Sequence, residues 1–246
     1  MRNVLITGGN KGIGLSISKR LIEDGWHVIS ISRNRNDSID GLANFEELCA
    51  DVSDENQCKD LFQNLANHKI DLDCIINNAG FSEWRSIQNI DHDFLSRMFA
   101  VNVFGYFYIT KYGLPLMKQN GSILNISSLA AMRGTPNNSA YVATKFAVRG
   151  MTQSLSKELG TKGIRVNAIN PVLISTEGLL SALQSHESPA KGSPERFLNE
   201  FASSQTSTGR LPTSEDVADL ACFLIGPSAS AISGQSINVD CGVLPN

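Results

Sequence analysis

The sequence lacks any apolar run near the roughly 20 residues that a transmembrane helix needs, so we expect no membrane association. The chain starts Met1-Arg2-Asn3 and enters a strand-like run at once, so we also expect no signal peptide. Basic residues are not in excess: 21 Lys and Arg stand against 24 Asp and Glu, and the net charge is −3. This balance argues against a nucleic-acid partner.

Cysteine is scarce, with five residues in 246. None lies in a C-x-x-C pair or beside a histidine at ligand spacing, so we expect no metal site. An odd, scattered set is typical of a reducing compartment, which predicts a cytoplasmic protein. The cysteines are Cys49, Cys58, Cys74, Cys222 and Cys241.

Short β-branched runs alternate with stretches of helical periodicity along the whole chain. This alternation predicts an α/β fold, a doubly wound parallel sheet of seven strands with helices on both faces. We expect one domain over residues 1–246, with ligands at the carboxyl ends of the strands. The predicted strands are Asn3–Thr7, His27–Ser32, Glu47–Ala50, Asp73–Asn77, Gly121–Ser127, Arg165–Asn170 and Ser236–Asp240.

One segment interrupts this alternation, from Ser175 to Gly209, and is rich in Ser, Pro and Gly. It contains two short predicted helices, Glu177–Gln184 and Pro194–Ala202, the second with Ser193 as N-cap before proline. Long insertions in compact domains are commonly functional, so we interpret residues 175–209 as a substrate lid.

The first predicted strand ends in a glycine-rich turn, Thr7-Gly8-Gly9-Asn10-Lys11-Gly12-Ile13-Gly14, after which a helix begins. Glycines allow a tight turn and a close approach of backbone to a pyrophosphate, whose charge rests on the helix N-terminus. The position between strand and helix favours dinucleotide binding over a purely structural turn.

The end of the second strand predicts the choice of cofactor. NAD-binding sites of this type carry an acidic residue there for the ribose 2′-hydroxyl, whereas this sequence has Ser32-Arg33. Arg33, with Lys11 in the glycine turn, can bind a 2′-phosphate. The alternative is that both are solvated surface cations. We expect NADP(H).

Tyr141 and Lys145 are four residues apart on a helix predicted over Ser139–Leu159, so they share one face. A cationic amine near a phenol lowers the phenol pKa, which suits proton transfer to a carbonyl oxygen. Ser128 follows the strand Gly121–Ser127 and could hydrogen-bond the same oxygen. The alternative reading makes Tyr141 a packing residue.

Together these motifs resemble the short-chain dehydrogenase/reductase family, in its TGxxxGIG/YxxxK subgroup, over nearly the whole chain, which implies a Rossmann fold. They occur in the family's order and spacing. The matching residues are Thr7-Gly8, Gly12-Ile13-Gly14, Asp51-Val52, Asn77-Asn78-Ala79-Gly80, Asn102, Ser128, Tyr141, Lys145 and Asn170-Pro171 with Thr176.

The resemblance implies that Ser128 and Tyr141 hold the substrate oxygen, that Tyr141 transfers the proton, and that Lys145 also binds the nicotinamide ribose. Asn102 would keep a water in the proton relay. Asn78 would order the sheet and the cofactor ribose, although Asn77 and Asn78 fit equally well as partners of strand-end backbone. The other implied cofactor contacts are Gly8, Asn10, Lys11, Gly12, Ile13, Gly14, Ser32, Arg33, Asp51 and Val52 at the adenine, Ala79, Gly80, Pro171, and Ile174 and Thr176 at the carboxamide.

Two positions depart from the family pattern. The usual Pro-Gly after the sixth strand reads Pro171-Val172, which bears on the backbone path and the nicotinamide contacts. The usual Asp-Gly-Gly near the C-terminus reads Asp240-Cys241-Gly242, away from the expected chemistry.

The expected substrate pocket is mainly apolar with two arginines, which could meet a carboxylate, a phosphate or an acidic carrier protein. Family members that reduce 3-oxoacyl groups on acyl carrier protein suggest that substrate, although the lid is longer than theirs. Alternatives are another small carbonyl compound, a catalytically inactive NADP-binding sensor, and an epimerase or dehydratase of a longer related family. The expected wall is Phe81, Trp84, Arg85, Leu129, Met132, Arg133 and Leu173.

Helices predicted near Phe94–Lys118 and over Ser139–Leu159 carry apolar residues on more than one face, and one sheet cannot cover them all. In the family such helices meet their symmetry mates. We therefore predict a homotetramer, with a homodimer as second choice. The apolar residues concerned are Phe104, Phe107, Phe146 and Met151.

Overall fold

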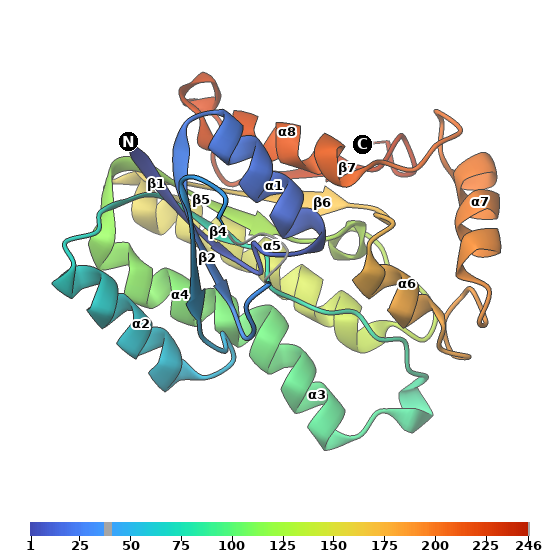
Figure 1. Ribbon diagram of the computed structural model, residues 1–246. Helices are drawn as coiled ribbons and strands as arrows, with labels where there is room; N and C mark the ends of the chain where they lie inside the picture. The colour runs from blue at the N-terminus through green and yellow to red at the C-terminus, as the bar shows by residue number, and fades with distance from the viewer. Residues whose placement is uncertain (37–40, 246) are drawn as a thin grey trace.

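The computed structural model describes residues 1–36 and 41–245, in which helices and strands alternate (Figure 1). In these residues, short 3₁₀ turns join the longer elements: η2 (Ile87–Asn89), η4 (Leu114–Leu116), η5 (Leu129–Ala131) and η6 (Pro227–Ala229). The longer elements are β1 (Arg2–Thr7), α1 (Gly12–Glu23), β2 (Trp26–Ser32), β3 (Phe45–Cys49), α2 (Glu55–Asn67), β4 (Leu72–Asn77), α3 (His92–Phe99), the π-helical turn η3 (Ala100–Phe104), α4 (Gly105–Gly113), β5 (Met117–Ile126), α5 (Ser139–Gly160), β6 (Arg165–Pro171), α6 (Glu177–Leu183), α7 (Pro194–Gln205), α8 (Ser214–Ile225) and β7 (Ser236–Val239).

The seven strands form one sheet in the order β3-β2-β1-β4-β5-β6-β7, and every neighbouring pair is parallel. The strand order reverses between β1 and β4, so the carboxyl ends of these strands flank the crevice in which such sheets bind ligands. The predicted fold class is confirmed. The largest errors in the strand bounds are at β3, which begins at Phe45, and at β5, which begins at Met117.

Helices cover both faces of the sheet (Figure 1). On one face α1 and α8 pack together, and Ile17, Leu21 and Val217 join the strand residues in one buried cluster. On the other face α2, α4 and α5 bury Phe62, Ile109 and Leu159. These two apolar layers hold the strands in position. They therefore also position the site at the carboxyl ends of the strands.

The predicted helix near Phe94–Lys118 is wrong in its extent. The structure has α3, the turn η3 and α4, and the helical run ends at Gly113. Pro115 lacks an N–H, and its ring would clash with the carbonyl one turn earlier, so an α-helix cannot continue through it. Met117 and Lys118 belong instead to β5.

The segment 175–209 contains α6 and α7 close to their predicted bounds, and Figure 1 shows both beyond the edge of the sheet. Ser193 occupies the N-cap of α7, but its side chain makes no capping hydrogen bond. Trp84, from the loop after β4, is buried against Leu183, Ala190 and Leu198 of this segment. In residues 1–36 and 41–245 no helix has the length and apolarity to cross a bilayer.

Candidate active site

One cavity at the carboxyl ends of the strands brings together most of the residues singled out in the sequence. It is lined from β1, β2, β4, β5 and β6, and also by the lid segment. The predicted site residues on its wall are Gly8, Asn10, Lys11, Gly12, Ile13, Ser32, Arg33, Asp51, Val52, Asn78, Ala79, Gly80, Ser128, Tyr141, Lys145, Pro171, Ile174 and Thr176.

Gly14 and Asn102 lie behind this wall. A side chain at Gly14 would collide with the carbonyl oxygen of Gly8, so glycine there lets α1 pack on the turn. Asn102 is fully buried in the π-helical turn, a feature that often marks functional sites. Its Oδ1 accepts the Phe81 N–H (3.0 Å), and its Nδ2 donates to the Phe81 carbonyl (2.9 Å). Asn102 therefore fixes the start of the loop after β4.

The glycine turn offers unused backbone donors to an anion. Gly8 and Gly12 have φ angles of 66° and 52°, in the left-handed region that glycine adopts freely. The N-cap of α1 is Lys11, whose ammonium has no acceptor for the helix N–H groups, and the first turn of α1 contains no acidic residue. In contrast, Asp54 caps α2 with its carboxylate. The N-terminus of α1 therefore suits a pyrophosphate.

The two asparagines after β4 have different surroundings. Asn77 is fully buried, and its Nδ2 donates to Asn125 (2.9 Å), away from the cavity. Asn78 lines the cavity, but its Nδ2 donates to the carbonyls of Thr7 (2.9 Å) and Gly8 (3.1 Å). Asn78 thus satisfies backbone at the end of β1 and holds the glycine turn, whereas Asn77 pairs with side chains in the interior.

The end of β2 is more complex than its sequence suggests. Arg35 lines the cavity together with Arg33 and Lys11, and all three are exposed. Glu47, from the neighbouring β3, accepts Nδ2 of Asn10 (2.9 Å). A carboxylate therefore lies near this end of β2, although Ser32-Arg33 supplies none. Arg35 could have been found from the sequence, because it is two residues after Arg33. Glu47 could not, because only the pairing of β3 with β2 brings it to Asn10 in the glycine turn.

Lys145 is buried at the base of the cavity. Its Nζ donates to the carbonyl oxygen of Ile126 (3.1 Å), which also accepts the hydroxyl of Tyr106 (2.8 Å). The same Nζ lies 5.6 Å from the centre of the Tyr141 ring. Loss of hydration on burial lowers the pKa of Lys145 to about 8.

Tyr141 differs from the sequence expectation of a lowered phenol pKa. Burial raises the pKa of Tyr141, and a hydrogen bond with Ser128 opposes this rise. Lys145 directs its hydrogen bond to Ile126, so in this state it does not offset the burial. The hydroxyl of Tyr141 is thus held in its protonated form, as a proton donor requires.

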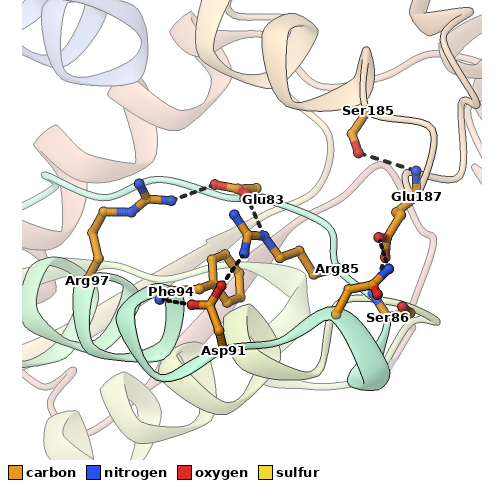
Figure 2. Close-up of polar contacts among 9 residues, drawn as sticks. Glu83, Arg85, Ser86, Asp91, Phe94, Arg97, Ser185 and Glu187 are labelled. Carbon is orange, nitrogen blue, oxygen red and sulfur yellow. Dashed lines mark hydrogen bonds and ion pairs between the residues drawn. The ribbon is translucent and has the colours of Figure 1, made fainter.

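The substrate side of the cavity is lined by Phe81, Trp84, Leu129, Arg133 and Leu173, as expected. Arg85 and Met132, also expected there, are not on this wall. Arg85 instead forms ion pairs with Glu83 (2.8 Å) and Asp91 (3.3 Å), as Figure 2 shows. It also stacks on the Phe94 ring at 4.3 Å, so its charge is already paired.

Three polar atoms on this wall are buried without a hydrogen-bond partner: Ser82 Oγ, Trp84 Nε1 and Asn138 Oδ1. Unpartnered buried polar groups are costly, so each of these atoms indicates a partner such as a water or a ligand. Neither Ser82 nor Asn138 belongs to a recognisable motif, so sequence analysis could not find them.

The two departures from the family pattern differ in their backbone conformation. Val172 is buried, has no positive φ, and donates its N–H to the Val239 carbonyl (3.1 Å). Cys241 has a φ of 52°, in the region that favours glycine.

Within the described part of the chain, no three His, Cys, Asp or Glu side chains are grouped as a metal ion needs.

Comparison with known proteins agrees with this geometry. A family profile described as enoyl-(acyl carrier protein) reductase matches residues 8–244. The chain is 33% identical to diacetyl reductase [(S)-acetoin forming] of Staphylococcus aureus, covering 97% of this chain and 96% of that protein. It is 32% identical to L-2,3-butanediol dehydrogenase of Corynebacterium glutamicum, covering 98% of each. A 3-ketoacyl-(acyl-carrier-protein) reductase from Brucella melitensis, solved with NADH, superposes with a TM-score of 0.85 at 30% identity, over 98% of each chain. This protein belongs to the short-chain dehydrogenase/reductase family of oxidoreductases.

Proposed function

We propose that the protein is an NADP(H)-dependent oxidoreductase that reduces a carbonyl to an alcohol, or runs the reverse reaction, with Tyr141 as the proton donor. The observation that carries the proposal is that Ser128, Tyr141 and Lys145 line the same cavity as the glycine turn. That cavity has room for a dinucleotide along β1 and β2 and for a carbonyl compound beside Tyr141.

The chemistry divides between the cofactor and the chain. When bound, the reduced nicotinamide supplies the hydride. The hydroxyl of Tyr141 gives its proton to the substrate oxygen, and Ser128 donates a hydrogen bond to that oxygen. Lys145, protonated at neutral pH, stabilises the phenolate that is left behind. Asn102 acts through Phe81, by fixing the loop that faces the substrate.

The charges around β2 support NADP(H). Arg33, Arg35 and Lys11 place three cations on the cavity wall, and the carboxylate of Glu47 lies close by, at Asn10. A 2′-phosphate has about two negative charges, and a guanidinium binds it in a bidentate manner. Glu47 is already engaged by Asn10, which moderates its repulsion. NADH binding is the alternative outcome of the test below.

The pocket favours a compact carbonyl compound with a second oxygen near the first. Phe81, Leu129 and Leu173 give its wall apolar surface, and the unpartnered atoms of Ser82, Trp84 and Asn138 could bind that second oxygen. The relatives named as diacetyl reductase and butanediol dehydrogenase support this substrate class. A 3-oxoacyl group on acyl carrier protein is the second candidate, supported by the Brucella neighbour. With Arg85 paired, only Arg133 remains of the two arginines expected to attract such a carrier.

A substrate panel tests the proposal. Oxidation of NADPH and of NADH would be followed with diacetyl, acetoin, acetoacetyl thioesters and simple ketones. We expect turnover with NADPH, fastest on the vicinal dicarbonyl or hydroxyketone. NADPH binding without turnover on any substrate would favour the inactive sensor.

We infer a cytoplasmic location from the free state of the five cysteines.

A further inference from the structure

Glu187 lies in the turn between α6 and α7 and holds the lid against the loop after β4. Its carboxylate accepts the backbone N–H of Ser86 and the Nδ2 of Asn89 (2.6 Å to the latter). Figure 2 shows Glu187 directed at Ser86 and away from its own segment. The N–H of Ser86 is the largest of the influences that lower the pKa of the Glu187 carboxyl, so it is ionised at neutral pH.

The backbone of Glu187 reaches a third segment. Its carbonyl oxygen accepts Nδ2 of Asn137 (3.1 Å), and the carbonyl of Asn137 accepts the N–H of Arg85 (2.7 Å). Asn137 has a φ of 56° and lies immediately before the N-cap of α5, four residues before Tyr141. Glu187 therefore joins the lid, the loop after β4 and the entry to the helix that carries Tyr141.

The loop to which Glu187 binds is itself fixed. Glu83 pairs with Arg85 (2.8 Å) and with Arg97 on α3 (2.9 Å), and Arg85 also pairs with Asp91 (3.3 Å). Asp91 in turn caps α3 through the N–H of Phe94 (2.7 Å), as the dashed lines in Figure 2 show. The lid is thus tied to an anchored surface.

We infer that Glu187 is a positioning residue, which closes the lid on the substrate side of the cavity and fixes the backbone before Tyr141. This inference rests on the proposed function. Glu187, Ser188 and Pro189 themselves line the cavity, so a lid released from Ser86 would leave its substrate side open. The apolar contacts of Trp84 would still hold the base of the lid. Glu187 adds polar contacts to a lid that otherwise packs through apolar side chains.

Glu187→Gln tests this role because glutamine keeps the size but presents an NH₂ to one of the two donors. The matched control is Glu195→Gln, which removes the same charge from an exposed position of the lid outside the cavity wall. We expect Glu187→Gln to raise KM for the ketone about tenfold, the effect of one charge-assisted hydrogen bond, with the NADPH Kd unchanged. Glu187→Asp, which keeps both oxygens, should recover part of this loss.

Tryptic cleavage of the NADPH-bound protein after Lys191, in the same lid turn, gives a readout besides activity. We expect faster cleavage in Glu187→Gln than in wild type and in Glu195→Gln. Equal cleavage rates, or faster cleavage with an unchanged KM, would overturn the inference. If wild type reduces no ketone in the panel, the proposed function fails, while the cleavage rates still decide whether Glu187 holds the lid.

Discussion

The Nζ of Lys145 lies 5.6 Å from the centre of the Tyr141 ring and donates a hydrogen bond to the carbonyl oxygen of Ile126 (3.1 Å). The backbone of β5 thus holds the amine in place. Because it is buried, its charge destabilises the folded protein while preparing the site for catalysis.

This cost predicts a stability effect for Lys145→Met. Burial lowers the pKa of Lys145 from 10.5 to about 8, so between these two values the unfolded chain binds a proton that the folded protein has lost. Wild-type stability should therefore rise with pH across this window. Below it the full penalty remains, and methionine should raise the free energy of unfolding at pH 7 by on the order of 1–3 kcal/mol while abolishing turnover. Urea unfolding at pH 7 and near pH 10 measures both effects, and a less stable variant would refute the account of Lys145.

Cofactor choice should follow the charges at the end of β2. NADPH should bind at least about tenfold more tightly than NADH, a difference near 1.4 kcal/mol. Arg33→Ala should weaken NADPH and leave NADH nearly unchanged, because only the former carries the 2′-phosphate. Fluorescence titration measures both constants. Equal constants for the two cofactors in wild type would disprove the preference.

A substitution of Glu47 tests the same charges in the opposite direction, because it removes a negative charge near the end of β2. Its carboxylate lies beside Asn10, near the cations that would bind a 2′-phosphate. Glu47→Gln keeps an acceptor for Asn10 and removes the negative charge, so it should tighten NADPH by a few-fold with little change for NADH. Weaker NADPH binding in this variant would mean that Glu47 supports the cofactor site instead of repelling the phosphate.

Assembly should depend on the exposed phenylalanines of the helices beside the active site. Phe104 and Phe107 are each 47% exposed and Phe146 is 44% exposed, a large apolar area for a helix surface. Met151, also expected there, is buried against Tyr106 and Val148 and takes no part. We predict a homotetramer. The double variant Phe104→Glu, Phe107→Glu should dissociate it into smaller species, because it places charges on the apolar surface.

Light scattering at micromolar concentration measures the mass of each variant. Ile87→Glu is the control, since Ile87 is exposed in the 3₁₀ turn η2, outside the helices that carry these phenylalanines. A wild-type monomer, or a double variant that keeps the wild-type mass, would contradict the predicted interface.

The alternation of apolar runs was sufficient to predict the seven strands, because parallel strands buried on both faces leave a strong local signal. The glycine turn, Tyr141 and Lys145 were equally visible, since each depends on spacing within one element. Glu47 and the pairing of Arg85 with Glu83 and Asp91 were not, because they depend on how separate loops and strands meet.

The pKa of Tyr141 escaped prediction for a related reason. Spacing alone placed a cation near the phenol, but the direction of the shift depends on burial and on where Lys145 directs its hydrogen bond. Both are properties of the packed protein, and the sequence does not encode them in a local pattern.

Turnover and NADPH affinity of Tyr141→Phe, measured on one folded sample, test the proposed mechanism most directly. Removing only the hydroxyl should leave the NADPH Kd and the melting temperature near their wild-type values. The rate should fall by roughly 10²–10⁴-fold, the usual contribution of a general acid, because the variant lacks the hydroxyl that donates the proton. A folded Tyr141→Phe protein that retains wild-type turnover would contradict the assignment of Tyr141 as the proton donor.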